Sequence, residues 1–125
     1  MNNKQTFIQL TNITKRYPLE NGEFYQALNG VTLTITEGEF VAIMGPSGSG
    51  KSTTMHILGA LDTTTSGSYL FKGKDISSYK PDELSKIRNR EIGFVFQSFN
   101  LLPRTTVFKN VERPMIYGKV PKVER

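Results

Sequence analysis

A glycine-rich segment from Gly45 to Ser52, which reads GPSGSGKS, constrains this chain more than any other feature. An apolar run, Phe40 to Met44, precedes it. The stretch from Ser52 to Leu61 follows it, with apolar residues at the three-residue spacing that is typical of one helix face. Six residues rich in glycine do not favour regular structure. The order is therefore predicted to be strand, glycine loop, helix.

The same segment fits the pattern G-x-x-x-x-G-K-[ST]. Its glycines let backbone N–H groups face inward as a nest for phosphate oxygens, and the next helix points its positive end at the same place. Lys51 can reach the β- and γ-phosphates, and the Ser52 hydroxyl is a hard oxygen ligand for Mg²⁺. A bare turn would not explain three glycines around Lys51 between a strand and a helix. We predict a site for a nucleoside triphosphate and Mg²⁺ formed by Gly45, Pro46, Ser47, Gly48, Ser49, Gly50, Lys51, Ser52 and Thr53.

Strands are predicted from two kinds of apolar pattern. Phe7 to Ile13 is rich in β-branched and apolar residues, and Val31 to Thr36 alternates apolar residues with threonine, so each predicts a strand with one buried face. Phe40 to Met44 and Ile92 to Phe96 are wholly apolar, which is typical of strands buried on both faces in parallel sheets. A short strand is expected at Tyr69 to Phe71.

Helices are predicted over Pro81 to Arg90, where proline suits the first turn, and over Val107 to Tyr117, before a glycine. Another helix is expected to begin at Pro121. A chain of 125 residues that is 37% hydrophobic has the size and apolar content of one globular domain.

The formal net charge of +5 arises mainly from residues 103–125, which carry six Lys or Arg against two Glu. These basic residues do not gather on one element with interleaved aromatic residues, so we interpret them as a solvated or partner-facing surface and expect no nucleic-acid partner. No apolar run approaches the roughly 20 residues that cross a bilayer, and the first six residues lack the apolar core of a secretory signal. We therefore expect a cytoplasmic protein. Because cysteine is absent, disulfides and thiolate metal sites are excluded.

Two regions resemble the ATPases of ATP-binding cassette (ABC) transporters. Gly38 to Thr53 is similar to their phosphate-loop region, whereas a P-loop alone would leave a kinase or GTPase open. Ile92 to Gln97, followed by Phe99 to Pro103, resembles the Q-loop of that family. Asp82 to Arg90 is similar to the subgroup that serves macrolide exporters and lipoprotein-release or peptide-export permeases.

The resemblance implies roles for individual residues. Tyr17 would stack on adenine, and Gln97 would contact Mg²⁺ or the attacking water and link the site to a membrane partner. Lys51 and Gln97 would be the catalytic residues, Ser52 and Gln97 the metal ligands, and ATP and Mg²⁺ the bound species. Without the resemblance, Tyr17 is an ordinary residue at a strand end and Gln97 a glutamine bonded to backbone.

The resemblance also implies a fold: an α/β, partial P-loop NTPase core with an amino-terminal antiparallel β subdomain. Residues 1–40 would form that subdomain, 41–103 the P-loop core through the Q-loop, and 104–125 the start of a helical subdomain. The chain contains no Leu-Ser-Gly-Gly-Gln signature and no Walker B segment. Asp62 ends an apolar run, but that run belongs to the predicted helix after the phosphate loop, so Asp62 is interpreted as a helix-end residue.

These gaps predict an amino-terminal fragment of one nucleotide-binding domain with an incomplete sheet. The Walker B strand of the family lies between the strands that end at Met44 and Phe96, so their edges would lack a partner. We expect self-association, a rearranged sheet or marginal stability, and nucleotide binding without turnover.

The function that follows is the motor subunit of a transporter. It would act with a membrane permease and a second ATPase subunit, on the inner face of the cell membrane. The alternative is a regulatory nucleotide-binding module or a cassette ATPase that acts on nucleic acid.

Overall fold

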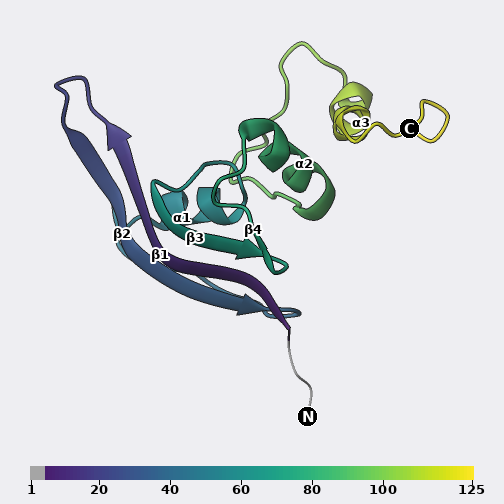
Figure 1. Cartoon of the computed structure of the whole chain (residues 1–125). Coiled ribbons are helices and arrows are strands. Elements are labelled where there is room, and N and C mark those ends of the chain that lie inside the picture. Colours follow the sequence, from purple (N-terminus) through teal and green to yellow (C-terminus); the bar gives the residue numbers. More distant parts are fainter. Residues whose placement is uncertain (1–4) are drawn as a thin grey trace.

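The computed structural model describes residues 5–125, so residues 1–4 of the predicted amino-terminal segment lie outside the described part. Four strands form one antiparallel sheet in the order β2-β1-β3-β4, and α3 lies beyond α2, away from that sheet (Figure 1). The elements are β1 (Thr6–Pro18), β2 (Phe24–Thr36), α1 (Lys51–Leu58), β3 (Ser66–Phe71), β4 (Lys74–Asp75), α2 (Pro81–Glu91) and α3 (Val107–Tyr117).

The strands β1 and β2 form a long antiparallel hairpin. Thr6 pairs with Thr36 at one end and Pro18 with Phe24 at the other. The predicted strands at Phe7 to Ile13 and Val31 to Thr36 are therefore confirmed as parts of longer strands. The antiparallel sheet is not confined to the first 40 residues, because β3 and β4 extend it beyond β1.

A bulge in β1 explains how β3 fits beside it. Asn12 has a positive φ of 51°, and the register of β1 shifts between Leu10 and Ile13 against β2. The Asn12 N–H donates to the Thr32 hydroxyl at 3.0 Å instead of to a strand carbonyl. Gly67 passes so close that a Cβ there would lie 2.6 Å from the Asn12 carbonyl oxygen. Only glycine fits this approach, since its φ is also +96°.

The core lies between one face of the sheet and the helices α1 and α2. The most deeply buried large side chains are Leu10 and Ile13 from β1 and Ile57 from α1. Tyr69 of β3 is buried with them, and its hydroxyl donates to the Leu58 carbonyl at 2.7 Å. This bond satisfies a polar group that would be costly to bury alone. The remaining buried apolar residues are Leu28, Leu58, Ala60, Phe71, Ile76 and Leu84.

The two predicted parallel strands are not formed in the described chain. Phe40 to Met44 and Ile92 to Phe96 have no strand pairing, and Phe40 and Met44 are 98% and 88% exposed. The prediction that both runs are buried strands is wrong here, although Ile43 and Ile92 pack against the core. A strand requires a neighbour for its hydrogen bonds, and the expected neighbour between these runs is not among residues 5–125. This agrees with the predicted incomplete sheet.

The helices match their predictions except at α1 and the carboxyl end. α1 ends at Leu58 rather than Leu61, because Gly59 caps it and Ala60 adopts a positive φ of 52°. α2 begins with proline as expected, and α3 has the predicted bounds. Residues 121–125 form only a turn, in which the Glu124 N–H donates to the Pro121 carbonyl. None of these helices in residues 5–125 is long and apolar enough to cross a membrane.

Candidate functional site

The glycine loop is anchored where α1 begins. Gly50 caps the helix with a φ of +86°, and a Cβ there would lie 2.7 Å from Leu28 Cδ2 and 2.9 Å from the Ala27 carbonyl oxygen. The loop is thus pressed against β2, and glycine is required for the close approach. Thr54 bonds back to the Gly50 carbonyl through its N–H and its hydroxyl. Within the described residues, no side chain caps α1 and its first turn holds no acidic residue, so its positive end faces the loop.

The Lys51 side chain folds over the loop that precedes it. Its ammonium donates to the Pro46 carbonyl at 2.6 Å and approaches the Ser49 hydroxyl at 3.4 Å. An ammonium carries three donors, so two contacts leave one for a further acceptor. The positive charge of Lys51 therefore lies against the loop, beside the Pro46 carbonyl and the Ser49 hydroxyl.

A cavity of about 460 Å³ lies against this loop. Ser47, Gly48 and the residues from Gly50 to Thr53 line one side of it. Tyr25 of β2 lines it as well, a residue that the sequence did not single out. Tyr25 pairs with Tyr17 across the β1–β2 hairpin, so the two residues share a face of the sheet. This strand pairing is the feature that could have indicated a role for Tyr25 at the loop.

A second cavity, of about 500 Å³, shares Lys51 and Ser52 with the first in its lining. Gln97 lines it together with those two residues, so the structure brings the three predicted groups to one space. The apolar part of its wall includes Met55 and Phe94. Residues that carry an ammonium, a hydroxyl and an amide therefore border one cavity at the start of α1.

Tyr17 lies beside the chain that follows α1. Its hydroxyl donates to Asp62 Oδ2 at 2.7 Å, while the buried Lys15 donates to Asp62 Oδ1 at 2.6 Å and to the Thr63 carbonyl at 2.6 Å. Burial raises the pKa of Tyr17, the Asp62 carboxylate raises it further, and the Thr53 side chain acts in the opposite direction. Burial acts to raise the pKa of Asp62, but hydrogen bonds from Lys15 and Tyr17 outweigh it and leave that pKa lowered.

This network gives Asp62 more than the helix-end role expected from the sequence. It lies beyond the end of α1 and joins the chain there to β1 by an ion pair. The sequence signal was the spacing of Lys15 and Tyr17, which places both side chains on one face of β1. The partner of these two residues could not be inferred without the fold.

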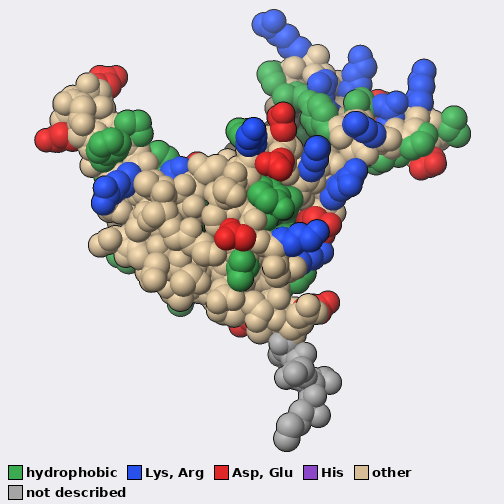
Figure 2. Space-filling model, in the orientation of Figure 1, with side chains coloured by type: hydrophobic (Ala, Val, Ile, Leu, Met, Phe, Trp, Pro, Cys, Tyr) green, Lys and Arg blue, Asp and Glu red, His purple; other side chains and the backbone are tan. Residues whose placement is uncertain are grey.

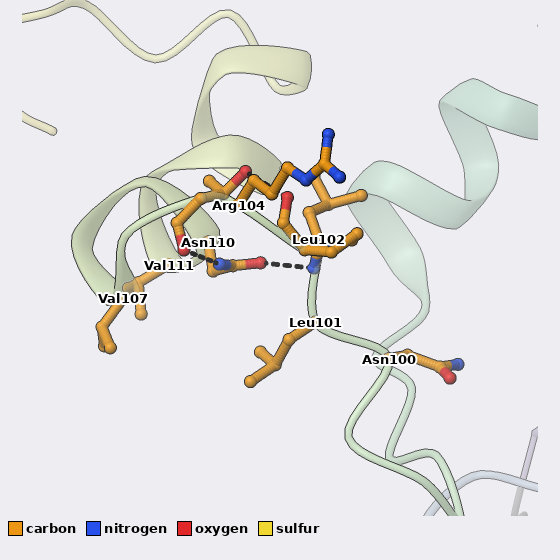
Figure 3. Close-up of a pocket in the computed structure, with 9 residues that line it drawn as sticks. Asn100, Leu101, Leu102, Arg104, Val107, Asn110 and Val111 are labelled. Atoms are coloured by element: carbon orange, nitrogen blue, oxygen red, sulfur yellow. Dashed lines mark hydrogen bonds between the residues drawn. The ribbon is translucent and has the colours of Figure 1, made fainter.

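A third cavity, of about 470 Å³, lies between the segment after Gln97 and the start of α3. Asn110 organises it: its side-chain oxygen accepts from the Leu102 N–H at 2.8 Å, and its amide nitrogen donates to the Thr105 carbonyl at 3.3 Å (Figure 3). Leu101 and Val107 line the same cavity with exposed apolar side chains. α3 has no buried residue, so its apolar face is available to a partner.

The oxygen donors present suit Mg²⁺ only in company with a phosphate ligand. No group of three His, Cys, Asp or Glu in the described part of the chain is arranged to hold a metal. The Ser52 hydroxyl and the Gln97 amide are hard oxygen donors, and both border the second cavity. Mg²⁺ in proteins usually keeps several water ligands and binds phosphate oxygens, so two protein ligands are consistent with its usual coordination.

The fold and the loop place the chain in the P-loop NTPase class, as a partial α/β core joined to an antiparallel sheet. The sequence profile described as ABC transporter matches residues 28–125. The chain belongs to the ABC transporter family. This confirms the resemblance seen in the sequence.

Two curated relatives illustrate the match. The chain is 57% identical over 118 residues to the uncharacterized ABC transporter ATP-binding protein YknY of Bacillus subtilis strain 168, covering 94% of this chain and 51% of that protein. It is 54% identical over 119 residues to the macrolide export ATP-binding/permease protein MacB of Brucella abortus strain 2308, covering 94% of this chain and 18% of that protein. The likeness to macrolide exporters is confirmed, and the chain spans about half the length of relatives such as YknY.

Solved structures give the same result. The dimeric ATP-binding cassette MJ0796 in a post-hydrolysis state, bound to ADP and Pi, is 50% identical with a TM-score of 0.81. The match covers 89% of this chain and 47% of that chain. A nucleotide-free ATP-binding cassette of an ABC transporter matches at 33% identity with a TM-score of 0.54, over 65% of this chain and 30% of that one.

Proposed function

We propose that this chain binds ATP with Mg²⁺ at Gly45 to Thr53 and forms part of the ATP-driven motor of a membrane transporter. The main support is the position of Lys51 and Ser52 at the start of α1, which Gly50 caps: both residues line two adjoining cavities. Membership of the ABC transporter family supports the same assignment. The family match also favours transport over the regulatory and nucleic-acid alternatives.

Each group has a role set by its chemistry. The loop amides and the positive end of α1 hold phosphate oxygens, and the Lys51 ammonium neutralises charge at the β- and γ-phosphates. Ser52 and Gln97 would hold Mg²⁺, which would stabilise negative charge on the phosphates. Tyr17 supplies a flat ring for adenine. Together these groups hold the triphosphate in place and supply positive charge where negative charge concentrates.

Hydrolysis and transport are proposed for the assembled protein. The cassette MJ0796 forms a dimer with ADP and Pi, and MacB is named for macrolide export, which supports a second ATPase subunit and a permease as partners. Because the 125 residues contain neither the signature nor a Walker B carboxylate, we propose that they bind nucleotide without turnover. The permease would hold the protein at the inner face of the membrane.

The region that follows Gln97 is the proposed contact with the permease. Leu101, Val107 and Phe108 are exposed apolar residues there, and Lys and Arg side chains gather over the α2 and α3 end of the molecule (Figure 2). Gln97 lies where this region meets the second cavity, so a shift of the region would move Gln97 relative to Lys51.

Calorimetric titration of the protein with ATP and Mg²⁺ tests the proposal. Lys51→Ala is expected to weaken binding by about tenfold or more, since it removes about 1.4 kcal/mol or more of interaction with phosphate. Lys74→Ala, which removes an exposed lysine of β4, is the matched control and leaves affinity unchanged. No binding by the unmodified chain, or equal binding by both variants, would contradict the proposal. Phosphate release that is lost in Lys51→Ala would refute the absence of turnover.

A further inference from the structure

Asp62 joins the chain that follows α1 to β1, the strand that carries Tyr17. Its two carboxylate oxygens accept from different residues of β1: Oδ1 from Lys15 and Oδ2 from the Tyr17 hydroxyl, at 2.6 and 2.7 Å. Its Oδ1 also accepts from the Thr63 N–H at 2.7 Å, which fixes the carboxylate on its own backbone. Hydrogen bonds therefore hold both oxygens of the carboxylate in place, and the carboxylate in turn fixes the position of the Tyr17 hydroxyl.

Lys15 restrains the same ring from another direction. Its ammonium lies 5.0 Å from the centroid of the Tyr17 ring, within the range of a cation–π interaction. Lys15 is itself buried and bonded to Asp62 and to the Thr63 carbonyl, so it cannot follow a moving ring. With a cation over one face of Tyr17, a base can stack only on the opposite face.

The network also sets the distance from the ring to the phosphate loop. Asp62 lies four residues beyond the end of α1, and Lys51 is the first residue of α1. The turn between them is closed by a bond from the Leu61 N–H to the His56 carbonyl. The Tyr17 hydroxyl is thus tied through Asp62 to the turn after α1, the helix that begins at Lys51.

We propose that Asp62 is a positioning residue for base recognition: together with Lys15 it holds the plane of Tyr17 at the place where the base of the nucleotide stacks. The proposal rests on the proposed function, because it assumes that the triphosphate lies at Gly45 to Thr53. It predicts that Asp62 controls affinity for ATP while leaving affinity for inorganic triphosphate, which has no base, unchanged.

Calorimetric titrations of the full chain with ATP and with inorganic triphosphate, both with Mg²⁺, separate these contributions. Tyr17→Phe keeps the ring and removes the oxygen that Asp62 holds, and Asp62→Asn keeps the shape of the side chain and removes its charge. Each is expected to weaken ATP binding by about three- to tenfold, a cost below that of losing a whole base stack. Binding of triphosphate stays within error of the unmodified chain. The double variant is no weaker than the stronger single variant, since both act on one ring.

Several outcomes decide the matter. Equal weakening of ATP and triphosphate would show a structural role and overturn the proposal, as would unchanged ATP affinity or additive effects in the double variant. If Asp62→Asn fails to fold, Tyr17→Phe alone carries the test. Glu91→Gln, which breaks the exposed pair with Lys72, is the matched control and changes neither affinity. Failure of the unmodified chain to bind either ligand would instead refute the proposed function.

Discussion

Replacing Gly67 by alanine tests the close approach of β3 to the bulge in β1. The left-handed conformation at φ +96° costs a residue with a Cβ about 1–2 kcal/mol. The new Cβ would also lie 2.6 Å from the Asn12 carbonyl oxygen and 2.7 Å from that of Thr11. These are backbone atoms of a paired strand, so relieving the overlap adds about 1–3 kcal/mol. The total loss of unfolding free energy is about 2–5 kcal/mol.

Gly73→Ala is the matched control for this prediction. Gly73 also has a positive φ, of +76°, but a Cβ there has no atom within 4 Å, so only the conformational cost of about 1–2 kcal/mol applies. The entropic effect of alanine on the unfolded chain is the same in both variants and cancels. For a chain of this length 1 kcal/mol corresponds to about 4 °C, so Gly67→Ala should melt about 4–12 °C below Gly73→Ala. Thermal melts followed by circular dichroism measure this, and equal melting temperatures would refute the steric argument.

Three further predictions concern the core, the ion pair and the last helix. Tyr69→Phe should cost about 1–3 kcal/mol in urea unfolding, because the buried Leu58 carbonyl loses its donor. Burial raises the pKa of Tyr69, so the free energy of unfolding of the unmodified chain should fall as pH rises above about 10. If Tyr69→Phe lost the same amount of stability at alkaline pH, this prediction would be contradicted. The pKa of Asp62 is lowered, so its contribution to the free energy of unfolding is present above about pH 4 and is lost as pH falls below that value. Urea unfolding of Asp62→Asn should therefore show a smaller loss of stability in acid than the unmodified chain. Thr106→Ala should destabilise α3 by about 1 kcal/mol, seen as faster hydrogen exchange of the Lys109 N–H, and unchanged exchange would count against the cap.

Local signals predicted the loop and the helices well. The glycine spacing from Gly45 to Gly50 specifies a loop before a helix, and Pro81 and Gly118 mark helix boundaries through their own backbone preferences. These features depend on residues within a few positions of one another. A single sequence is therefore sufficient to find them.

Features that depend on distant partners were found less well. Phe40 to Met44 has the composition of a buried strand, but a strand exists only where another supplies its hydrogen bonds. Asp62 was interpreted as an ordinary helix end because the residues that give it a role, Lys15 and Tyr17, lie more than 40 positions earlier. Tyr25 was missed for the same reason, since only strand pairing brings it to the loop.

The position of the core along the chain has a consequence for synthesis. Within residues 5–125, every buried apolar residue of the core lies between Leu10 and Leu84, and the last strand of the sheet ends at Asp75. A ribosome adds about 5–20 residues each second, whereas hairpins form within microseconds. The sheet and α1 can therefore assemble during translation, so that the phosphate loop is already shaped when Gln97 emerges to meet it.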